Sequence, residues 1–339
     1  MDERYSRQQL FSPIGEAGQK KLNESSVTII GAGALGASAA EMLVRAGVGT
    51  VTIADRDYVE YSNLQRQQLY TEKDAAEQMP KAAAAAKRLR EINSGVHVHG
   101  EVVDVDFTWI EAKAAETDLI IDGTDNFDTR LLINDAARKY GKPWIYGACV
   151  GSIGMVHPFL PGERPCFRCV WKRIPSQGQT CDTVGVIAPA VQSVAAKQTA
   201  AALKILVGDG ESIPVTLDYF DLWNQQQFSI GLQSSKDPGC ESCGEKATYP
   251  ALTYEHSNKT SVLCGRDTVQ IRPGESRQLN FERLERDWES RNWSVRKNPY
   301  LLSVQTETRR IVLFQDGRAL IHGTSDVQEA KRWYAQLLG

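Results

Sequence analysis

A glycine-rich turn between two apolar runs constrains the fold of this chain more than any other feature. The turn "GAGALG" at residues 31–36 follows a strand-like run, and a second such run follows at residues 51–54. Strand, turn, helix and strand in this order predict a βαβ unit of a mostly parallel sheet with right-handed crossovers. Gly31, Gly33 and Gly36 would let backbone amides approach a phosphate at the positive end of the helix.

An acidic residue follows the second apolar run. Asp55 is placed to accept hydrogen bonds from ribose hydroxyls, as an acid at the end of a second strand does in dinucleotide-binding folds. The glycine turn and its acidic partner indicate nucleotide binding, with a purely structural turn as the alternative, and they do not choose between NAD and ATP. An NAD-dependent oxidoreductase therefore stays open from these residues.

The polar segment "YSNLQRQQLY" at residues 61–70 suits neither a core nor an ordinary turn. A site that cleaves a triphosphate needs cations near developing negative charge, and Asn63 and Arg66 fit that need. Lys81 lies in the first turn of a predicted helix, where a cation opposes the helix dipole at a cost of about 0.3–1 kcal/mol when exposed. A nearby anion would offset this cost. The ordinary alternatives are a solvated loop and a lysine tolerated by solvent.

The segment "DGTDNFDTR" follows another predicted strand, at the sheet edge where ligands of such folds bind. A carboxylate there can hold Mg²⁺ between phosphates, and we favour Asp125 for this role. A helix N-cap is the alternative, and it is the interpretation we prefer for Asp128.

Four of the seven cysteines form two pairs, "CFRC" and "CESC", about 70 residues apart. Two such turns can supply four thiolates to a closed, structural Zn²⁺ site, with a redox pair as the alternative. The proposed ligands are Cys166, Cys169, Cys240 and Cys243. Cys181 lies in a Gly, Ser and Thr-rich segment and is either a nucleophile or an inert thiol. Cys149 and Cys264 have strand-like contexts and are expected in the core.

The pattern along the chain predicts two domains. Strands alternate with helices up to about residue 250, which indicates an α/β fold with a Rossmann-like, doubly wound, mostly parallel sheet. Residues 251–339 read as a small α+β domain. The apolar stretches are interrupted by polar residues, and the N-terminus lacks the pattern of a signal peptide, so we expect a cytoplasmic protein without a membrane span. A net charge of -3 makes nucleic acid an unlikely partner.

Taken in order, the motifs resemble those of the ThiF/MoeB family of E1-like adenylyltransferases over about residues 4–245. The matching segments are "RYSRQ", "GAGALG", "AGVGTVTIADRD", "SNLQRQ", "PK", "TDN", "CFRC", "TCDTVGV" and "CESC". The resemblance implies adenylation, with ATP, of the C-terminal Gly-Gly carboxylate of a ubiquitin-like sulfur-carrier protein (ThiS- or MoaD-like), in thiamine or molybdopterin biosynthesis.

The resemblance also implies roles for individual residues. The glycine turn would hold phosphates, Asp55 the ribose, Asp125 Mg²⁺, and the triphosphate would contact Asn63, Arg66 and Lys81. Arg7 matches an arginine that reaches the neighbouring subunit's site, which implies a homodimer. The paired cysteines match the zinc ligands, and Cys181 matches a loop cysteine used for sulfur transfer or conjugation in some members. A cysteine desulfurase or another sulfur donor is then a further partner.

Three alternatives stay open beside this interpretation. One is an E1-like enzyme that adenylates a carboxylate on tRNA, although the negative net charge and paired zinc motifs argue against it. The others are the NAD-dependent oxidoreductase and a catalytically silent scaffold for a ubiquitin-like partner. The last 80 or so residues depart from the minimal family pattern and lack a convincing rhodanese loop around Cys264, so we expect no persulfide from them; partner docking is a hypothesis for their role.

Overall fold

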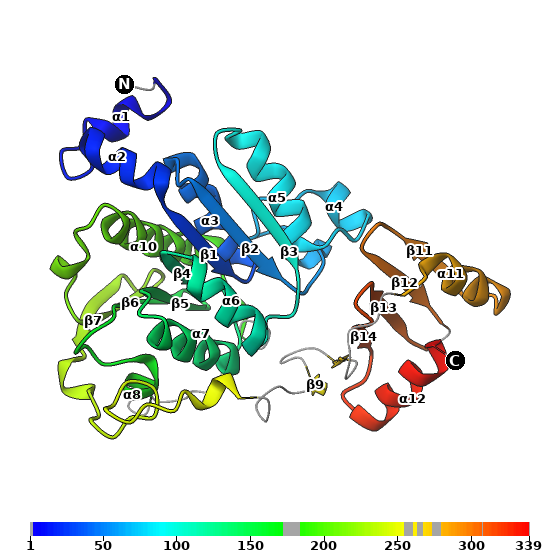
Figure 1. The fold of residues 1–339 in the computed structure, drawn as a ribbon. Coiled ribbons are helices and arrows are strands. Elements are labelled where there is room, and N and C mark those ends of the chain that lie inside the picture. Colours follow the sequence, from blue (N-terminus) through cyan, green and yellow to red (C-terminus); the bar gives the residue numbers. More distant parts are fainter. Residues whose placement is uncertain are drawn as a thin grey trace. The chain divides into compact units, whose positions relative to one another are not determined.

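The computed structural model describes residues 3–171, 184–253, 260–262, 267–272, 279–306 and 308–338. The chain divides into two compact units, Met1–His256 and Ser257–Gly339. Each unit has its own hydrophobic core and is described by itself (Figure 1).

The first unit contains an eight-stranded sheet in the order β3-β2-β1-β4-β5-β6-β7-β8. Its strands are β1 (Ser26–Ile30), β2 (Thr50–Asp55), β3 (His97–Val102), β4 (Leu119–Asp122), β5 (Trp144–Val150), β6 (Ile153–Phe159), β7 (Thr216–Asp221) and β8 (Gln226–Gly231). The first five pair in parallel and the remaining pairs are antiparallel. The predicted doubly wound, mostly parallel sheet is therefore confirmed for this half of the sheet.

Helices cover both faces of this sheet (Figure 1). They are α1 (Ser6–Gln9), α2 (Gly15–Glu24), α3 (Ala34–Ala46), α4 (Glu72–Ala76), α5 (Lys81–Ile92), α6 (Phe107–Glu116), α7 (Phe127–Lys139), α8 (Phe167–Trp171) and α10 (Ala188–Leu206). Helices α3, α5 and α10 share one core cluster, and α6, α7 and α8 share the other. Strand order reverses between β1 and β4, and such a switch point is where ligands of this fold bind.

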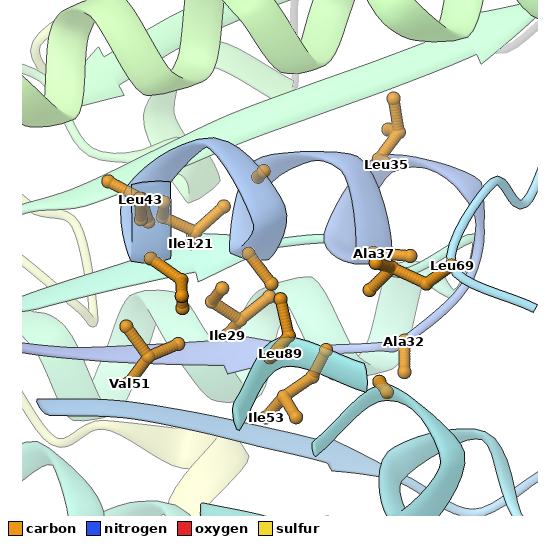
Figure 2. Packing of buried hydrophobic residues seen from close by; sticks show 14 of the residues in the cluster. Ile29, Ala32, Leu35, Ala37, Leu43, Val51, Ile53, Leu69, Leu89 and Ile121 are labelled. Carbon is orange, nitrogen blue, oxygen red and sulfur yellow. The ribbon is translucent and has the colours of Figure 1, made fainter. Parts of the chain in front are cut away.

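Alanines let α3 approach the sheet closely, because they bury apolar surface without needing much space or losing side-chain entropy. Ala37, Ala39 and Ala40 are fully buried. Figure 2 shows side chains of this cluster that come from α3 and from neighbouring elements, with labels on Ile29, Ala32, Leu35, Ala37, Leu43, Val51, Ile53, Leu69, Leu89 and Ile121. Helix α3 ends where Gly47 takes the left-handed conformation at φ 81°, which favours glycine.

The cap predicted for α7 is wrong by two residues. The N-cap is Asn126, whose Oδ1 accepts from the backbone N–H of Thr129 at 3.0 Å, and Asp128 lies inside the first turn. Asn126 has the extended backbone that a cap requires, and its short side chain reaches the free amide. Asp128 then places a negative charge at the positive end of the helix, which is favourable in another way.

The second unit is a six-stranded antiparallel sheet in the order β11-β12-β13-β14-β10-β9, with two helices. Its elements are β9 (Thr260–Val262), β10 (Thr268–Ile271), α11 (Phe281–Ser290), β11 (Ser294–Lys297), β12 (Leu301–Gln305), β13 (Arg310–Phe314), β14 (Ala319–His322) and α12 (Val327–Leu338). Trp288 of α11 is fully buried in its core. The expected small α+β fold is confirmed here. Among the described helices of both units, none combines the length and apolar character that crossing a membrane requires.

Candidate nucleotide-binding edge and cysteine cluster

Two loops touch at the switch point between β1 and β4. A Cβ on Gly31 would lie 2.6 Å from the carbonyl oxygen of Gly123, and one on Gly36 would lie 1.8 Å from that of Gly31. Gly31 also has φ +94°, a conformation that L side chains rarely adopt. A Cβ on Gly33 would lie 3.9 Å from its nearest neighbour, the carbonyl oxygen of Gly123, so this side of the turn stays open. The glycines thus bring two backbones together and leave room for a ligand.

Ala32, in the middle of the glycine turn, is held on both sides. Its N–H donates to Oδ2 of Asp55 at 2.6 Å, and its carbonyl accepts from the hydroxyl of Tyr70 at 2.6 Å. Because a peptide unit is planar, these bonds also orient the N–H of Gly33. Burial raises the pKa of Tyr70 well above its usual value, which keeps the hydroxyl protonated as a donor.

Asp55, Asp57 and Lys81 form a group of charges that act on one another. Burial raises the pKa of Asp55, while the charge of Lys81 acts to lower it. The Lys81 side chain is buried, with the residue 4% exposed, and its Nζ lies 3.5 Å from Oδ2 of Asp57. Asp57 is therefore one anion that offsets the unfavourable position of Lys81 at the start of α5. An ammonium has three donors, so Lys81 can also bind a second anion.

The polar loop at residues 61–70 is more buried than a solvated loop. Asn63 is 1% exposed and Gln67 is 4% exposed. Nδ2 of Asn63 and Oε1 of Gln67 have no hydrogen-bond partner within the described residues. Buried polar atoms are nearly always paired in folded proteins, so these two amide groups keep bonding capacity that a ligand or a water molecule can take up. Arg66 is half-buried and donates to the carbonyl of Ser62 at 3.0 Å.

The loop after β4 carries an exposed carboxylate. Asp125 is exposed, whereas Asp122 is fully buried and pairs with Arg130 at 2.8 Å. Burial alone would lower the pKa of Arg130, but the charges of Asp122 and Asp125 contribute to raising it overall. Among the described contacts Asp125 accepts no hydrogen bond from the buried pair, so it can offer oxygens to a cation, as Mg²⁺ requires.

Two predicted site residues lie elsewhere. Arg7 is exposed on α1, whose neighbour Gln8 donates to the carbonyl of Ala46 at the far end of α3. Because α3 has 13 residues, this end is about 20 Å from the glycine turn. Arg7 is therefore not brought to its own chain's nucleotide edge. Cys181 and Cys264 lie outside the described residues, while Cys149 is buried in β5 as expected.

The four paired cysteines come together. Their Sγ atoms all lie within 4.8 Å of one another, and three pairs are 3.5, 3.7 and 3.8 Å apart. Zn–S bonds of about 2.3 Å in a tetrahedron give S···S distances of about 3.8 Å, so the cluster fits zinc. Hydrogen bonding between the thiols raises the pKa of Cys166, chiefly through Cys169, and lowers that of Cys243, chiefly through Cys166. A divalent cation would replace the shared protons.

Helix α7 joins the two cysteine turns. The buried carboxylate of Asp135 accepts from Ser242 in the second turn and pairs with Arg168 in the first at 3.2 Å. Arg168 also donates to the hydroxyl of Ser242 at 2.7 Å. Asn134 accepts from the backbone N–H of Phe167 at 2.9 Å. Both cysteine turns are therefore bonded to α7, which covers the sheet.

Comparison with known proteins places this geometry in a family. The family model described as "ThiF family" matches residues 5–242. The chain belongs to the ThiF family. It is 52% identical, over the full length of both chains, to the "Sulfur carrier protein ThiS adenylyltransferase" of Bacillus subtilis. It is 34% identical to the "Molybdopterin-synthase adenylyltransferase" of Escherichia coli, over 71% of this chain and 96% of that one.

A solved structure confirms the fold. The crystal structure of E. coli MccB with ATP superposes with a TM-score of 0.61 at 23% sequence identity, covering 72% of this ThiF-family chain and 74% of that one. The resemblance inferred from the motifs is confirmed by the family match. Asp57, Gln67, Tyr70 and Arg130 were not predicted as site residues. All four lie within segments that the sequence singles out: Gln67 in "SNLQRQ", and the other three at the ends of "AGVGTVTIADRD", "YSNLQRQQLY" and "DGTDNFDTR". Residue type alone did not distinguish them from their neighbours.

Proposed function

We propose that this chain uses ATP to adenylate the C-terminal Gly-Gly carboxylate of a ThiS-type sulfur-carrier protein. Its full-length Bacillus relative is named a sulfur carrier protein ThiS adenylyltransferase. The observation that supports ATP is the polar loop at residues 61–70 with its two unpaired amide atoms. Tyr70 joins this loop to the open glycine turn and to the backbone of the buried Lys81. The thiamine-type carrier is favoured over the molybdopterin-type carrier because the ThiS relative is 52% identical over the full chain, against 34% over 71% of the chain for the molybdopterin-synthase relative.

The reaction forms a bond from a carboxylate oxygen of the carrier to the α-phosphorus of ATP and breaks the bond from that phosphorus to pyrophosphate. The carboxylate is already ionised at neutral pH, so no general base is needed. The site must instead bring two anions together and stabilise the leaving pyrophosphate. Fixed cations and oriented amides can do both.

The described residues divide this work. Amides of the glycine turn, Lys81 and Asn63 would bind the phosphates, and Arg66 would turn from its own loop toward the leaving group. Asp55 would accept from the ribose. Mg²⁺ held by Asp125 would neutralise part of the phosphate charge.

The remaining parts of the proposal concern assembly. Zn²⁺ bound by the four cysteines would be structural, because a closed site leaves no open position. The exposed Arg7 would complete the site of a second subunit in a homodimer. Cys181 would take part in transfer of sulfur from a donor such as a cysteine desulfurase. Residues 1–250 would form the adenylating domain, and residues 251–339 a docking domain for the carrier.

ATP–pyrophosphate isotope exchange tests the proposal. Purified protein would be assayed with Mg²⁺ and separately with a ThiS-type carrier, a MoaD-type carrier, and each carrier lacking its last glycine. Exchange only with the intact ThiS-type carrier is the expected result. Exchange with the MoaD-type carrier alone would show that the chain acts in molybdopterin synthesis instead. If ATP binds but neither carrier supports exchange, the proposal that a sulfur carrier is the substrate is refuted.

A further inference from the structure

The ends of β4 and β5 diverge next to the candidate site. These strands pair only at Ile120 with Trp144 and at Ile121 with Ile145 within the described residues. Beyond these pairs, helix side chains bond to the strand carbonyls. Gln198 of α10 donates to the carbonyl of Asp122 at 2.8 Å, and Arg130 of α7 donates to that of Gly147 at 3.1 Å. Two helices from opposite faces therefore hold the strand ends that the ladder does not.

Arg130 makes three polar contacts from one guanidinium. Its Nε donates to Oδ2 of Asp122 at 2.8 Å, and its Nη2 donates to the carbonyls of Thr124 at 2.7 Å and Gly147 at 3.1 Å. The guanidinium also lies 5.0 Å from the ring centre of Tyr146. A planar fork can hold three acceptors in fixed directions, which a lysine ammonium cannot reproduce from one flexible stem.

Gln198 completes the arrangement from the other face. Its side chain is fully buried, and its Nε2 also lies 3.3 Å from the carbonyl of Ile145. A Cβ on Gly147 would lie 2.4 Å from this nitrogen. The missing side chain at Gly147 therefore makes room for Gln198, while the carbonyl of Gly147 accepts a hydrogen bond from Arg130.

The segment held in this way carries the proposed metal ligand. Asp122 accepts from the N–H and hydroxyl of Thr124 through Oδ1, at 2.9 and 2.7 Å, while Arg130 holds the same carboxylate through Oδ2. Thr124 is thus fixed at its amide, hydroxyl and carbonyl. Asp125 follows immediately and is exposed. Its backbone direction is determined by a residue that is anchored at three points.

We propose that Arg130 is a positioning residue which, together with Gln198, aims the carboxylate of Asp125 at the metal of a bound metal–ATP complex. This inference rests on the proposed function, because it needs ATP to bind at the edge formed by β1 and β4. Arg130 itself touches neither metal nor nucleotide in this assignment. Its removal therefore weakens metal binding more than it weakens contacts made by the glycine turn and Lys81.

The test uses the full chain with Arg130→Lys, and Arg90→Lys as the matched control. Arg90 of α5 also donates its guanidinium to a strand carbonyl, that of Val98 at 2.7 Å, but on the edge strand β3. Mn²⁺ affinity would be measured by electron paramagnetic resonance with a non-hydrolysable ATP analogue. The Mg²⁺ dependence of pyrophosphate exchange would be measured in parallel.

For Arg130→Lys we expect Mn²⁺ affinity at least tenfold weaker, a similar rise in the Mg²⁺ needed for half-maximal exchange, and a KM for ATP at saturating Mg²⁺ within threefold of wild type. Arg90→Lys should match wild type throughout. A folded Arg130→Lys protein with wild-type Mn²⁺ affinity, or one that weakens nucleotide and metal equally, would overturn the inference.

A second variant covers failure of the first to fold. Gln198→Met is close in shape and should weaken Mn²⁺ affinity in the same selective way, so unchanged affinity in that protein overturns the inference as well. The proposed function has its own outcome in this experiment. Wild-type protein that binds neither the analogue nor Mn²⁺ would refute ATP binding at this edge, whereas binding by wild type with no effect of either variant refutes only the positioning role.

Discussion

The cysteine cluster and the nucleotide-binding edge satisfy their polar groups in opposite ways. Around the cluster, Asp135 and Arg168 bond to groups of the same chain, and the four sulfurs lie at distances that one ion would bridge. At the edge, amide atoms of Asn63 and Gln67 stay buried without a described partner. A structural site is completed by its own fold, whereas a substrate site keeps bonding capacity for a molecule that leaves again.

The largest effect should come from the cluster. Cys240→Ser removes one of four thiolates, and structural zinc binding is worth about 10–16 kcal/mol in isolated zinc-finger peptides. In a larger core, we expect loss of zinc and a fall in Tm of at least about 10 °C, measured by metal analysis and calorimetry. Cys149→Ser, which changes a buried cysteine outside the cluster, should keep the zinc. Full zinc content or an unchanged Tm in Cys240→Ser would contradict a structural role for the metal.

The edge should respond in the reverse manner, with activity lost and stability kept. Arg66→Ala removes a half-buried cation whose described bond is to its own loop. We expect exchange to slow by about a thousandfold, equivalent to about 4 kcal/mol of transition-state stabilisation, with Tm within about 2 °C of wild type. Arg88→Ala on the exposed side of α5 serves as the control. Turnover near the wild-type rate would show that Arg66 does not contact the phosphates.

The same contrast explains what the sequence could reveal. The cysteine pairs and the glycine turn were predictable because they are local: spacing alone determines the chelating turns, and a strand before and a helix after determine the turn. The approach of the glycine turn to the loop after β4 follows from the parallel pairing of β1 and β4. Lys81 and Asp125 were singled out as oddities, a cation at the wrong helix end and a carboxylate shortly after a strand end, and their roles toward a ligand stay predictions.

The missed features depend on contacts between distant segments. Nothing near Arg130 in sequence reveals that it would reach the carbonyl of Gly147, and Tyr70 looks like ordinary core until its hydroxyl meets Ala32. Strands β7 and β8 were not predicted individually. In β8 the alternation of Phe228 and Ile230 with polar residues was available, although the strand is exposed at every position. The cap of α7 was misplaced because both Asn126 and Asp128 are good caps, and only the backbone distinguishes them.

A buried histidine offers a stability effect that belongs to neither site. His157 of β6 contacts the carbonyl of Thr216 at 2.7 Å, and burial lowers its pKa from 6.5 to about 4. Since the unfolded chain binds the proton more tightly, this contribution is complete above pH 6.5 and is lost as the pH falls toward 4. The shift corresponds to at most about 3 kcal/mol.

His157→Gln should flatten this pH dependence while preserving a donor toward Thr216. The measurement is urea unfolding between pH 4 and pH 7, with His97→Gln at an exposed position of β3 as the control. Wild type and His97→Gln should lose stability across the window more steeply than His157→Gln. Equal slopes in all three proteins would mean that His157 does not stay neutral in the fold.

The smallest change offers the sharpest comparison between the two kinds of site. Gln67→Met replaces an amide whose Oε1 has no described partner by a side chain of similar shape. Removing an unsatisfied buried polar group is neutral or stabilising, so we expect the free energy of unfolding to stay equal or rise by up to about 1 kcal/mol. If the amide binds the ligand, the rate of exchange should fall by about tenfold to a hundredfold, or roughly 1.4–2.7 kcal/mol.

Ser242→Ala at the cluster should behave oppositely. The hydroxyl of Ser242 is bonded to Asp135 and Arg168, so its removal should lower stability and leave the KM for ATP unchanged. A Gln67→Met protein that loses stability and keeps full activity would show that its amide is paired within the fold and that buried, unpaired atoms do not mark the ligand at this edge.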